Sequence, residues 1–380
     1  MTKLFKDFLN SEKSGGLVLI FCTAISLLIA NSVFGQSYQA FWHTQIAGNS
    51  LEHWVNDGLM AIFFLLIGLE LKHEMYEGQL ANVKNALLPI FGAIGGMLFP
   101  AALFLLFNFG TNTQSGAGIP MATDIAFALG ILSLLGNRVP TSLKVFLTAL
   151  AVIDDLGAIL VIAIFYSKAL FWTNLFIALG IWVSLFLLKK LRVNNLIPYL
   201  IAGVAMWYFM LHSGVHATIT GVLLAFAIPY SKGNPQSASA ILQHALHKPV
   251  AFIILPLFAL ANTAIVLNAA SFQSLTSNYS LGIAVGLLVG KPLGILLLSF
   301  IAVKAGICKL PIDLNWNSIF GAGILGGIGF TMSIFITLLA FDKASIIDNS
   351  KLAILLSSLL AGIAGLVVLK STLKQRQLPE

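Results

Sequence analysis

Long runs of hydrophobic residues alternate with short polar segments along the whole chain. A helix rises about 1.5 Å per residue, so roughly 20 apolar residues cross a hydrocarbon core of about 30 Å. The runs have about this length, and we predict an all-α polytopic membrane protein with twelve transmembrane helices. The predicted spans cover residues 15–34, 59–71, 86–107, 117–135, 143–166, 171–188, 196–212, 214–229, 249–267, 281–303, 317–340 and 352–369.

Lysine and arginine are distributed unevenly between the predicted loops, which tests the number of spans. Cytoplasmic loops of membrane proteins carry an excess of these residues. Seventeen of the 21 fall on one side, Lys168, Lys343 and Lys351 fall on the other, and Lys291 lies inside a span. We therefore expect both termini in the cytoplasm.

Composition agrees with a membrane protein and excludes other classes. Hydrophobic residues make up 58% of the chain and charged residues 9%, whereas a soluble domain has about a quarter charged. The net charge of +7 reflects the loop asymmetry and does not indicate nucleic acid as a partner. Cys22 and Cys308 are too few for a disulfide framework. The N-terminus leads into a full-length apolar segment, so we expect no removable signal peptide.

Two adjacent aspartates lie in the middle of one apolar run. Asp154 and Asp155 occur in the string A-L-A-V-I-D-D-L-G-A-I-L, far from either end of the predicted span 143–166. A charge at the centre of a membrane helix costs about 2.5 to 3.5 kcal/mol on insertion scales, and such residues mark ion paths or proton relays. The alternative is a protonated pair that only joins helices by hydrogen bonds. Neighbouring residues point about 100° apart, so one carboxylate can face a cation while the other faces a different partner. Protons and a metal cation would then compete for the site.

Two further charges and two irregular segments accompany the aspartates. Lys291 lies inside the tenth span and is too central to reach water easily, so we expect it to pair with a carboxylate. Asp124 follows a Gly- and Pro-rich stretch in the fourth span, and the eleventh has five glycines in 321–329. Interrupted backbone at membrane depth is tolerated where it lines a cavity or is buried in protein. Asp124 can neutralise the positive N-termini of broken helices and Lys291 the negative C-termini, so both have a structural interpretation beside direct ligation.

The two interrupted segments recur in a symmetric arrangement. Each is the second member of a three-helix group, and the groups, helices 3–5 and 10–12, are seven helices apart. Because seven is odd, they run with opposite topology. This predicts an inverted repeat with two discontinuous crossing helices, helices 4 and 11. Such a pattern marks transporter binding sites, including those of the antiporter NhaA.

Seven strings resemble bacterial sodium/proton antiporters of the NhaA type, in that family's order and over nearly the whole chain. They are F-F-L-L-I-G-L-E-L-K at 63–72, A-T-D-I-A-F at 122–127, A-V-I-D-D-L-G-A-I at 151–159, H-S-G-V-H-A-T at 212–218, L-P-L-F-A-L-A-N at 255–262, G-K-P-L-G-I at 290–295 and G-I-G-F-T-M-S-I-F-I at 327–336.

The resemblance implies a site and an architecture. Asp154 and Asp155 would exchange cation and proton, with Thr123 as a further sodium ligand, and Lys291 would pair with Asp154 and offer another proton carrier. The residues placed at the helix crossing are Thr123, Asp124 and Gly329. Within a single membrane domain spanning residues 1–380, a core bundle of 86–167 and 281–370 would rock against a panel and dimer-interface bundle of 15–85 and 171–270. Residues 36–57, between the first two helices, would help to hold a homodimer.

The family's pH response is assigned to a cytoplasmic funnel, where the resemblance is weaker. The matching residues are Glu70, Lys72, Glu74, His244 and His247. The departures are Gln243 in place of a glutamate, Ala240 and Ile241 where basic residues are common, and His73 in place of an arginine. These departures put the pH response of this chain in question.

The resemblance implies an antiporter in the bacterial inner membrane that exchanges cytoplasmic sodium or lithium for external protons, and thereby controls pH and sodium. It implies no cofactor and no enzyme activity. The expected substrates and partners are sodium, protons, the lipid bilayer and a second copy of the chain. If two protons leave for each sodium bound, the exchange is electrogenic.

Other functions are weighed against the antiporter. A retinal pump using Lys291 has too few helices to match this chain, and an intramembrane aspartyl protease needs aspartates on separate helices. A sodium-coupled symporter of an organic anion with a similar core is the strongest alternative. His212 and His216, four residues apart, resemble a metal or haem pair, but no third ligand accompanies them and we interpret them as structural histidines at a helix end.

Overall fold

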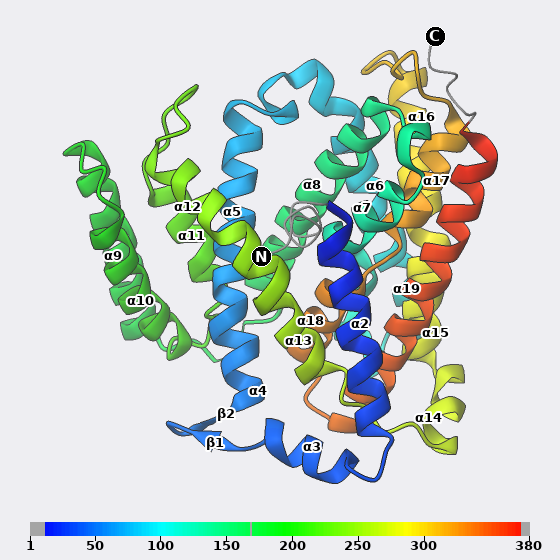
Figure 1. Ribbon diagram of the computed structural model, residues 1–380, viewed down its shortest axis with the longest axis horizontal. Coiled ribbons are helices and arrows are strands. Elements are labelled where there is room, and N and C mark those ends of the chain that lie inside the picture. Colours follow the sequence, from blue (N-terminus) through cyan, green and yellow to red (C-terminus); the bar gives the residue numbers. More distant parts are fainter. Residues whose placement is uncertain (1–11, 168, 374–380) are drawn as a thin grey trace, which may run out of the picture.

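The computed structural model describes residues 12–167 and 169–373, and most of them are helical (Figure 1). Five cations of the predicted charge asymmetry, Lys3, Lys6, Lys168, Lys374 and Arg376, lie outside the described residues, as does most of the N-terminal lead-in.

Helices account for nearly all of the secondary structure. Their bounds are α2 Glu12–Ala30, α3 Gly35–Trp42, α4 Leu51–His53, α5 Met60–Tyr76, α6 Val83–Asn108, α7 Ile125–Ser133, α8 Thr141–Phe165, α9 Trp172–Lys190, α10 Leu196–Leu211, α11 Ile219–Ala227, α12 Ala238–Pro249, α13 Leu255–Asn262, α14 Ala269–Gln273, α15 Asn278–Val285, α16 Lys291–Lys304, α17 Trp316–Gly326, α18 Phe330–Ala340 and α19 Ala344–Thr372. Short 3-10 and π-helical turns join several of them: η1 Trp54–Leu59, η2 Gln79–Ala81, η3 Gln114–Met121, η4 Gly136–Arg138, η5 Val250–Ile254, η6 Ser274–Thr276 and η7 Gly286–Gly290.

The described residues contain many helical segments long and apolar enough to cross a membrane. By length and composition there are eight such segments, or ten if each of two bent pairs is counted as one span. The bent pairs are α2 with α3, at 118°, and α17 with α18, at 48°. The chain is therefore a polytopic, nearly all-helical membrane protein.

Two predicted features of the chain need correction near its N-terminus. The first span was expected to reach residue 34, but α2 ends at Ala30, where the Asn31 side chain donates to the Leu27 carbonyl at 2.8 Å. The fold is not purely helical, because strand β1 (Gln45–Ile46) pairs antiparallel with β2 (Asn49–Ser50). Such short strands carry no hydrophobic signal that a sequence pattern can reveal.

Other helices end at positions that differ from those predicted from hydrophobicity, because polar residues continue a helix beyond its apolar part. The segment predicted at 249–267 is instead helical from Ala238 to Asn262, with the Ser237 side chain accepting from the Ala240 amide at the N-terminus. The segment predicted at 214–229 yields only α11, because Gly214 has a φ of +84° in the turn that precedes it. The spans predicted at 59–71 and 352–369 are longer, reaching residues 51–76 and 344–372.

The helices form two neighbouring groups in Figure 1. Helices α5 and α9 to α12 lie on the left of the view, and α6, α8, α15 to α17 and α19 lie on the right. Helices α3 and α4 and the β1–β2 hairpin lie at the lower end, together with the start of α19. The last turns of α19 lie at the opposite, upper end.

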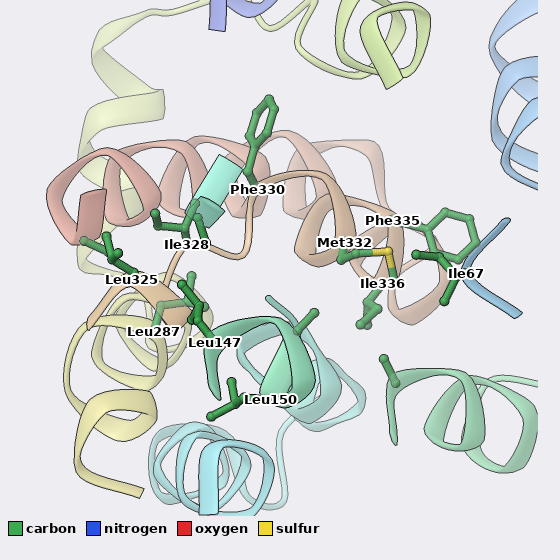
Figure 2. Close-up of a cluster of buried hydrophobic side chains, with 14 of the residues drawn as sticks. Ile67, Leu147, Leu150, Leu287, Leu325, Ile328, Phe330, Met332, Phe335 and Ile336 are labelled. Carbon is green, nitrogen blue, oxygen red and sulfur yellow. The ribbon is translucent and has the colours of Figure 1, made fainter. Parts of the chain in front are cut away.

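The hydrophobic core surrounds the break between α17 and α18. Figure 2 shows Leu147 and Leu150 of α8 near Leu287 and Leu325, with Ile328 between the two halves of the interrupted helix. These side chains are almost completely buried. Packing on all sides therefore holds the irregular backbone in one conformation.

Two glycines allow α6 and α16 to cross at very short distance. A Cβ atom on Gly95 would lie 2.0 Å from the Gly294 carbonyl oxygen, and one on Gly294 would lie 2.2 Å from the Gly95 oxygen. Only a residue without a side chain fits at either position. This contact fixes the start of α16, where Lys291 lies.

Candidate functional site

The two central aspartates lie on α8 and are almost inaccessible, with Asp154 0% and Asp155 1% exposed. They nevertheless face different surroundings, as adjacent helical positions do. Asp154 is bonded to other side chains, whereas Asp155 lines a cavity of about 380 Å³. The Oδ1 atoms of both carboxyl groups have no hydrogen-bond partner among the described residues. Buried oxygens of this kind are free to bind a cation or a proton.

Lys291 begins α16 and follows the π-helical turn η7. Its Nζ atom lies 2.8 Å from Asp154 Oδ2, with both side chains fully buried, so the expected pairing is present. The ammonium group also donates to the Met121 carbonyl oxygen at the end of η3. A buried lysine therefore connects the aspartate helix to the C-terminal end of an interrupted segment, where negative charge accumulates.

The fourth predicted span is interrupted at 122–124, between η3 and α7. The Thr123 hydroxyl lies 2.8 Å from Asp154 Oδ2 and 2.9 Å from the Gly326 carbonyl oxygen at the end of α17. Thr123 thus connects the aspartate to the second interrupted helix. The backbone amide of Asp124 donates to the Ile328 carbonyl oxygen at 2.6 Å, so one unwound segment satisfies a backbone group of the other.

The Asp124 side chain accepts hydrogen bonds at the N-terminal ends of both α7 and α18. Its Oδ1 accepts from the Phe127 amide of α7 at 3.0 Å. Its Oδ2 accepts from the amide and hydroxyl of Thr331 in α18, at 3.2 and 2.5 Å. The carboxylate therefore lies at two positive helix ends, which stabilise negative charge. Gly329 precedes α18, where a Cβ atom would lie 2.1 Å from Ser333 Oγ.

The cavity next to Asp155 is lined by several residues that carry side-chain oxygens. Carboxyl and hydroxyl groups of Thr123, Asp124, Asp155 and Thr331 belong to residues that line it, and Glu70 lies further along its wall. Hard ions prefer such oxygens. The described residues contain no group of three or more His, Cys, Asp or Glu side chains suited to a tightly held metal.

Three of the four residues expected to respond to pH line this cavity or a second one. Glu70 and His247 both line the cavity next to Asp155, and His247 Nδ1 is 3.7 Å from Glu70 Oε1. His244 and Gln243 line a second cavity of about 800 Å³, which also includes His247. Glu74 lies one turn beyond Glu70 on α5.

Lys72 does not belong to this funnel, contrary to our expectation. Its side chain is buried and points to α11, where Nζ donates to the carbonyl oxygens of Ala225 (3.1 Å), Phe226 (3.3 Å) and Ile228. It therefore caps the negative C-terminal end of a short helix. Residues two apart on a helix face opposite sides, so Glu70 and Lys72 have separate surroundings.

A loop beside the second cavity is fastened to the end of α5. The amide of Gly233 donates to the Glu77 carboxylate. The pKa of Glu77 is lowered mainly by this hydrogen bond, and a hydrogen bond from the Tyr230 hydroxyl lowers it further. The pKa of Tyr230 is raised to about 12, mainly by burial and to a smaller extent by the Glu77 carboxylate. His73 Nδ1 lies 3.1 Å from the Tyr230 hydroxyl.

Sequence reasoning missed two residues that position the interrupted helices. Thr331 binds Asp124, and Ser358 of α19 accepts from the Phe330 amide at the start of α18 at 3.1 Å. Thr331 had a signal, because it follows the glycine-rich interruption directly. Ser358 had none, because serines are common in membrane helices.

His212 and His216 do not lie on one helical face. Helix α10 ends at Leu211, and His216 lies in the following loop. His212 Nδ1 is 2.8 Å from the Tyr208 carbonyl oxygen, and His216 Nε2 is 2.9 Å from that of Tyr166. Both histidines bind backbone at helix ends, as their structural interpretation requires.

A buried lysine and carboxylates between interrupted membrane helices define a class of protein. This combination is characteristic of membrane transport proteins, in which charges at membrane depth are retained because they bind what is moved.

Comparison with known proteins identifies the family. The model of the family described as Na+/H+ antiporter 1 matches residues 6–369, so the chain belongs to this family. A protein of Flavobacterium psychrophilum named Na(+)/H(+) antiporter NhaA is 70% identical over 374 residues, covering 98% of this chain and 97% of that protein. Proteins of the same name from Cytophaga hutchinsonii and Vibrio cholerae are 63% identical over 375 residues and 50% identical over 378 residues. They cover 99% and 98% of this chain, and 97% and 99% of their own lengths.

Proposed function

We propose that this chain is a sodium/proton antiporter that binds both ions at the paired aspartates. The observation that carries the proposal is the difference between the two carboxyl groups, since Asp155 faces the cavity and Asp154 is bonded to Lys291 and Thr123. The relatives named as antiporters support it and give no support to a symporter of organic anions. Lithium, also a hard monovalent ion, fits the same oxygens.

Each site residue has a proposed role. Asp155 is the primary ligand and loses a proton when sodium enters, and Asp154 and Thr123 complete the sodium site. Sodium at this site attracts the Asp154 carboxylate and weakens its pairing with the Lys291 ammonium, so Lys291 can release the second proton and become neutral. Two protons exchanged for one sodium make transport electrogenic, and the membrane potential contributes about 2.3 kcal/mol per charge per 100 mV.

The crossing residues have a separate role. Asp124 and Thr123 hold the two interruptions together, and Gly329 permits their close approach. The charged groups keep the half-helix ends stable in a low-dielectric interior, which leaves the aspartate pair free to titrate. No cofactor and no enzyme chemistry are required for this exchange.

We propose twelve membrane spans, in which helices 3–5 and 10–12 form inverted repeats with discontinuous fourth and eleventh members. The bend of 48° between α17 and α18 and the unwound residues 122–124 support this arrangement. Residues 86–167 and 281–370 form the ion-translocating core bundle, and 15–85 and 171–270 form the panel. Alternation arises when the core moves against the panel.

The proposed setting is the bacterial inner membrane, with both termini in the cytoplasm. The uneven distribution of lysine and arginine supports this orientation. Residues 36–57, which form α3, the β1–β2 hairpin and α4 at one end of the molecule, are the proposed contact of a homodimer (Figure 1). Glu70, Glu74, His244 and His247 at the opposite mouth are proposed to mediate a pH response.

Sodium-evoked pH change in proteoliposomes tests the function. Sodium added to one side should release protons on that side in the unmodified protein. Asp155→Asn keeps the shape of the side chain but removes the titrating charge, so it should abolish this signal and calorimetric sodium binding. Asn56→Asp serves as the control, because it introduces a carboxylate instead of removing one and lies in the lining of a different cavity, which also contains Glu52 and Asp57. This variant should retain sodium binding. Sodium binding to Asp155→Asn with unchanged affinity would place the cation site elsewhere.

A further inference from the structure

A buried lysine near the end of the molecule that carries α3 and α4 has no part in the exchange described above. Lys351 lies in the first half of α19 and is 5% exposed. Its Nζ atom is 3.9 Å from Glu52 Oε1 of α4. Holding a lysine inside a membrane protein is costly, and it persists where its charge is compensated and used.

The charged groups around this pair come from three segments. Glu52 Oε2 also lies 3.8 Å from His43 Nδ1, just after α3, and Asp348 lies one turn before Lys351 on α19. Glu52 therefore lies between a histidine of the proposed dimer segment and a lysine of the proposed core. The ion pair joins two parts of the chain that are about 300 residues apart.

Two other ion pairs each stay within one proposed bundle. Lys291 and Asp154 both belong to the core, and Glu70 and His247 both belong to the panel. Either pair can remain intact while the bundles move. The pair between Glu52 of the panel and Lys351 of the core must stretch or break if they do so.

The same end of the molecule is closed between its surface and the aspartates. A cavity of about 420 Å³ is lined by Glu52, Asp57 and Phe335, and Asp155 is not among its lining residues. The Phe335 ring packs 5.3 Å from that of Phe64 and 6.5 Å from that of Phe258, measured between centroids. Figure 2 shows Phe335 beside Ile67. Asp155 is instead reached from the cavity that contains Glu70 and His247.

We propose that the Glu52–Lys351 pair is an ionic latch that holds the outer side closed while the aspartates face the inner cavity. The proposal rests on the exchange described above, in which the core moves against the panel. Opening of the outer cavity separates the two charges, so the latch sets how often the outward-open state forms. Because Glu52 belongs to the proposed dimer segment, the latch also connects that contact to the moving core.

Accessibility of the outer cavity to a thiol reagent tests the latch without measuring transport. Cys22 and Cys308 are first replaced by serine, and Leu338→Cys places a single thiol in the cavity lining. A membrane-impermeant maleimide is then added outside right-side-out vesicles. Glu52→Gln and Lys351→Met should each raise the labelling rate several-fold. The exchanged pair Glu52→Lys with Lys351→Glu should return it towards that of the parent.

Lys343→Gln is the matched control, because it removes an exposed lysine from the same end of α19 and should leave the labelling rate unchanged. Glu52 is partly exposed, so Glu52→Gln tests the latch even if a substitution at Lys351 prevents folding. Equal labelling of Glu52→Gln and the parent would overturn the latch. That result would not affect the antiport proposal, which is tested by sodium binding at Asp155.

Discussion

At the scale of single residues, burial of charge is the dominant energetic problem of this protein. Asp154, Asp155 and Lys291 are all inaccessible to solvent, and removing ions of this size from water costs several kcal/mol each. The Lys291–Asp154 contact and the Thr123 hydroxyl compensate Asp154. Asp155 retains an unbonded oxygen at the cavity. The uncompensated group is therefore the one that gains most from binding a cation or proton.

We predict that Lys291→Ala lowers the thermal stability of the detergent-solubilised protein. The substitution leaves a buried carboxylate without its partner, a change that typically costs about 3 to 5 kcal/mol. The melting temperature should therefore fall by several degrees. Adding Asp154→Asn should restore much of the loss, because the unpaired charge is then removed. A melting temperature that does not change in the single variant would show that the pair contributes little to stability.

At the scale of helices, the ends of segments are stabilised by groups from elsewhere in the chain. The Asp124 side chain accepts hydrogen bonds at the N-terminal ends of α7 and α18, and Lys72 donates to carbonyl groups at the C-terminal end of α11. Glu77, at the end of α5, accepts from the loop that follows α11. Each interaction supplies charge of the sign that the exposed backbone groups prefer. The irregular segments are therefore held by specific bonds.

The attachment of the loop to Glu77 should depend on pH. Because the pKa of Glu77 is lowered in the folded protein, its ionised form favours the attached loop. This contribution is complete above the ordinary glutamate pKa and is lost as the pH falls through the lowered value. The protection of the Gly233 amide against hydrogen exchange, measured relative to its intrinsic exchange rate at each pH, should fall in that acidic window. In Glu77→Gln the exchange should be faster at neutral pH and should lose this acid-dependent step, whereas unchanged protection would contradict the attachment.

At the scale of the whole molecule, two openings of different character lie at opposite ends of the fold. The cavity with Glu70 and His247 reaches Asp155, and the cavity with Glu52 and Phe335 is separated from it by aromatic packing. The neighbouring second cavity contains Gln243, a residue that cannot titrate. The side chain at this position therefore contributes no charge that changes with pH.

We predict a steeper pH dependence of transport in Gln243→Glu. The added carboxylate faces the cavity that also contains His73, His244 and His247, so it is placed to interact electrostatically with three imidazole groups. The activity profile of proteoliposomes should rise over a narrower pH range than in the unmodified protein. Gln236→Glu adds the same group on the exposed loop and should not change the slope. Equal slopes in all three proteins would show that position 243 plays no part.

Hydrophobic runs and charge placement determined much of this protein by themselves. A chain with this content of apolar residues is stable only in a bilayer, so membrane embedding follows from sequence alone. The aspartate pair, Lys291 and the interruptions near Asp124 and Gly327 were also visible, because polar groups and helix breakers are costly in such runs.

Only the tertiary structure decided how these groups are divided between binding and support. Asp154 and Asp155 are neighbours in sequence, and their surroundings differ because Lys291 and Thr123 contact Asp154 while Asp155 lines a cavity. Lys72 seemed by position to belong with Glu70, yet its side chain turns to the carbonyl groups of α11. Such assignments depend on contacts between residues that are distant in sequence, 31 positions apart for Thr123 and Asp154 and 153 for Lys72 and Ala225. A local pattern contains no information on which distant group a side chain will meet.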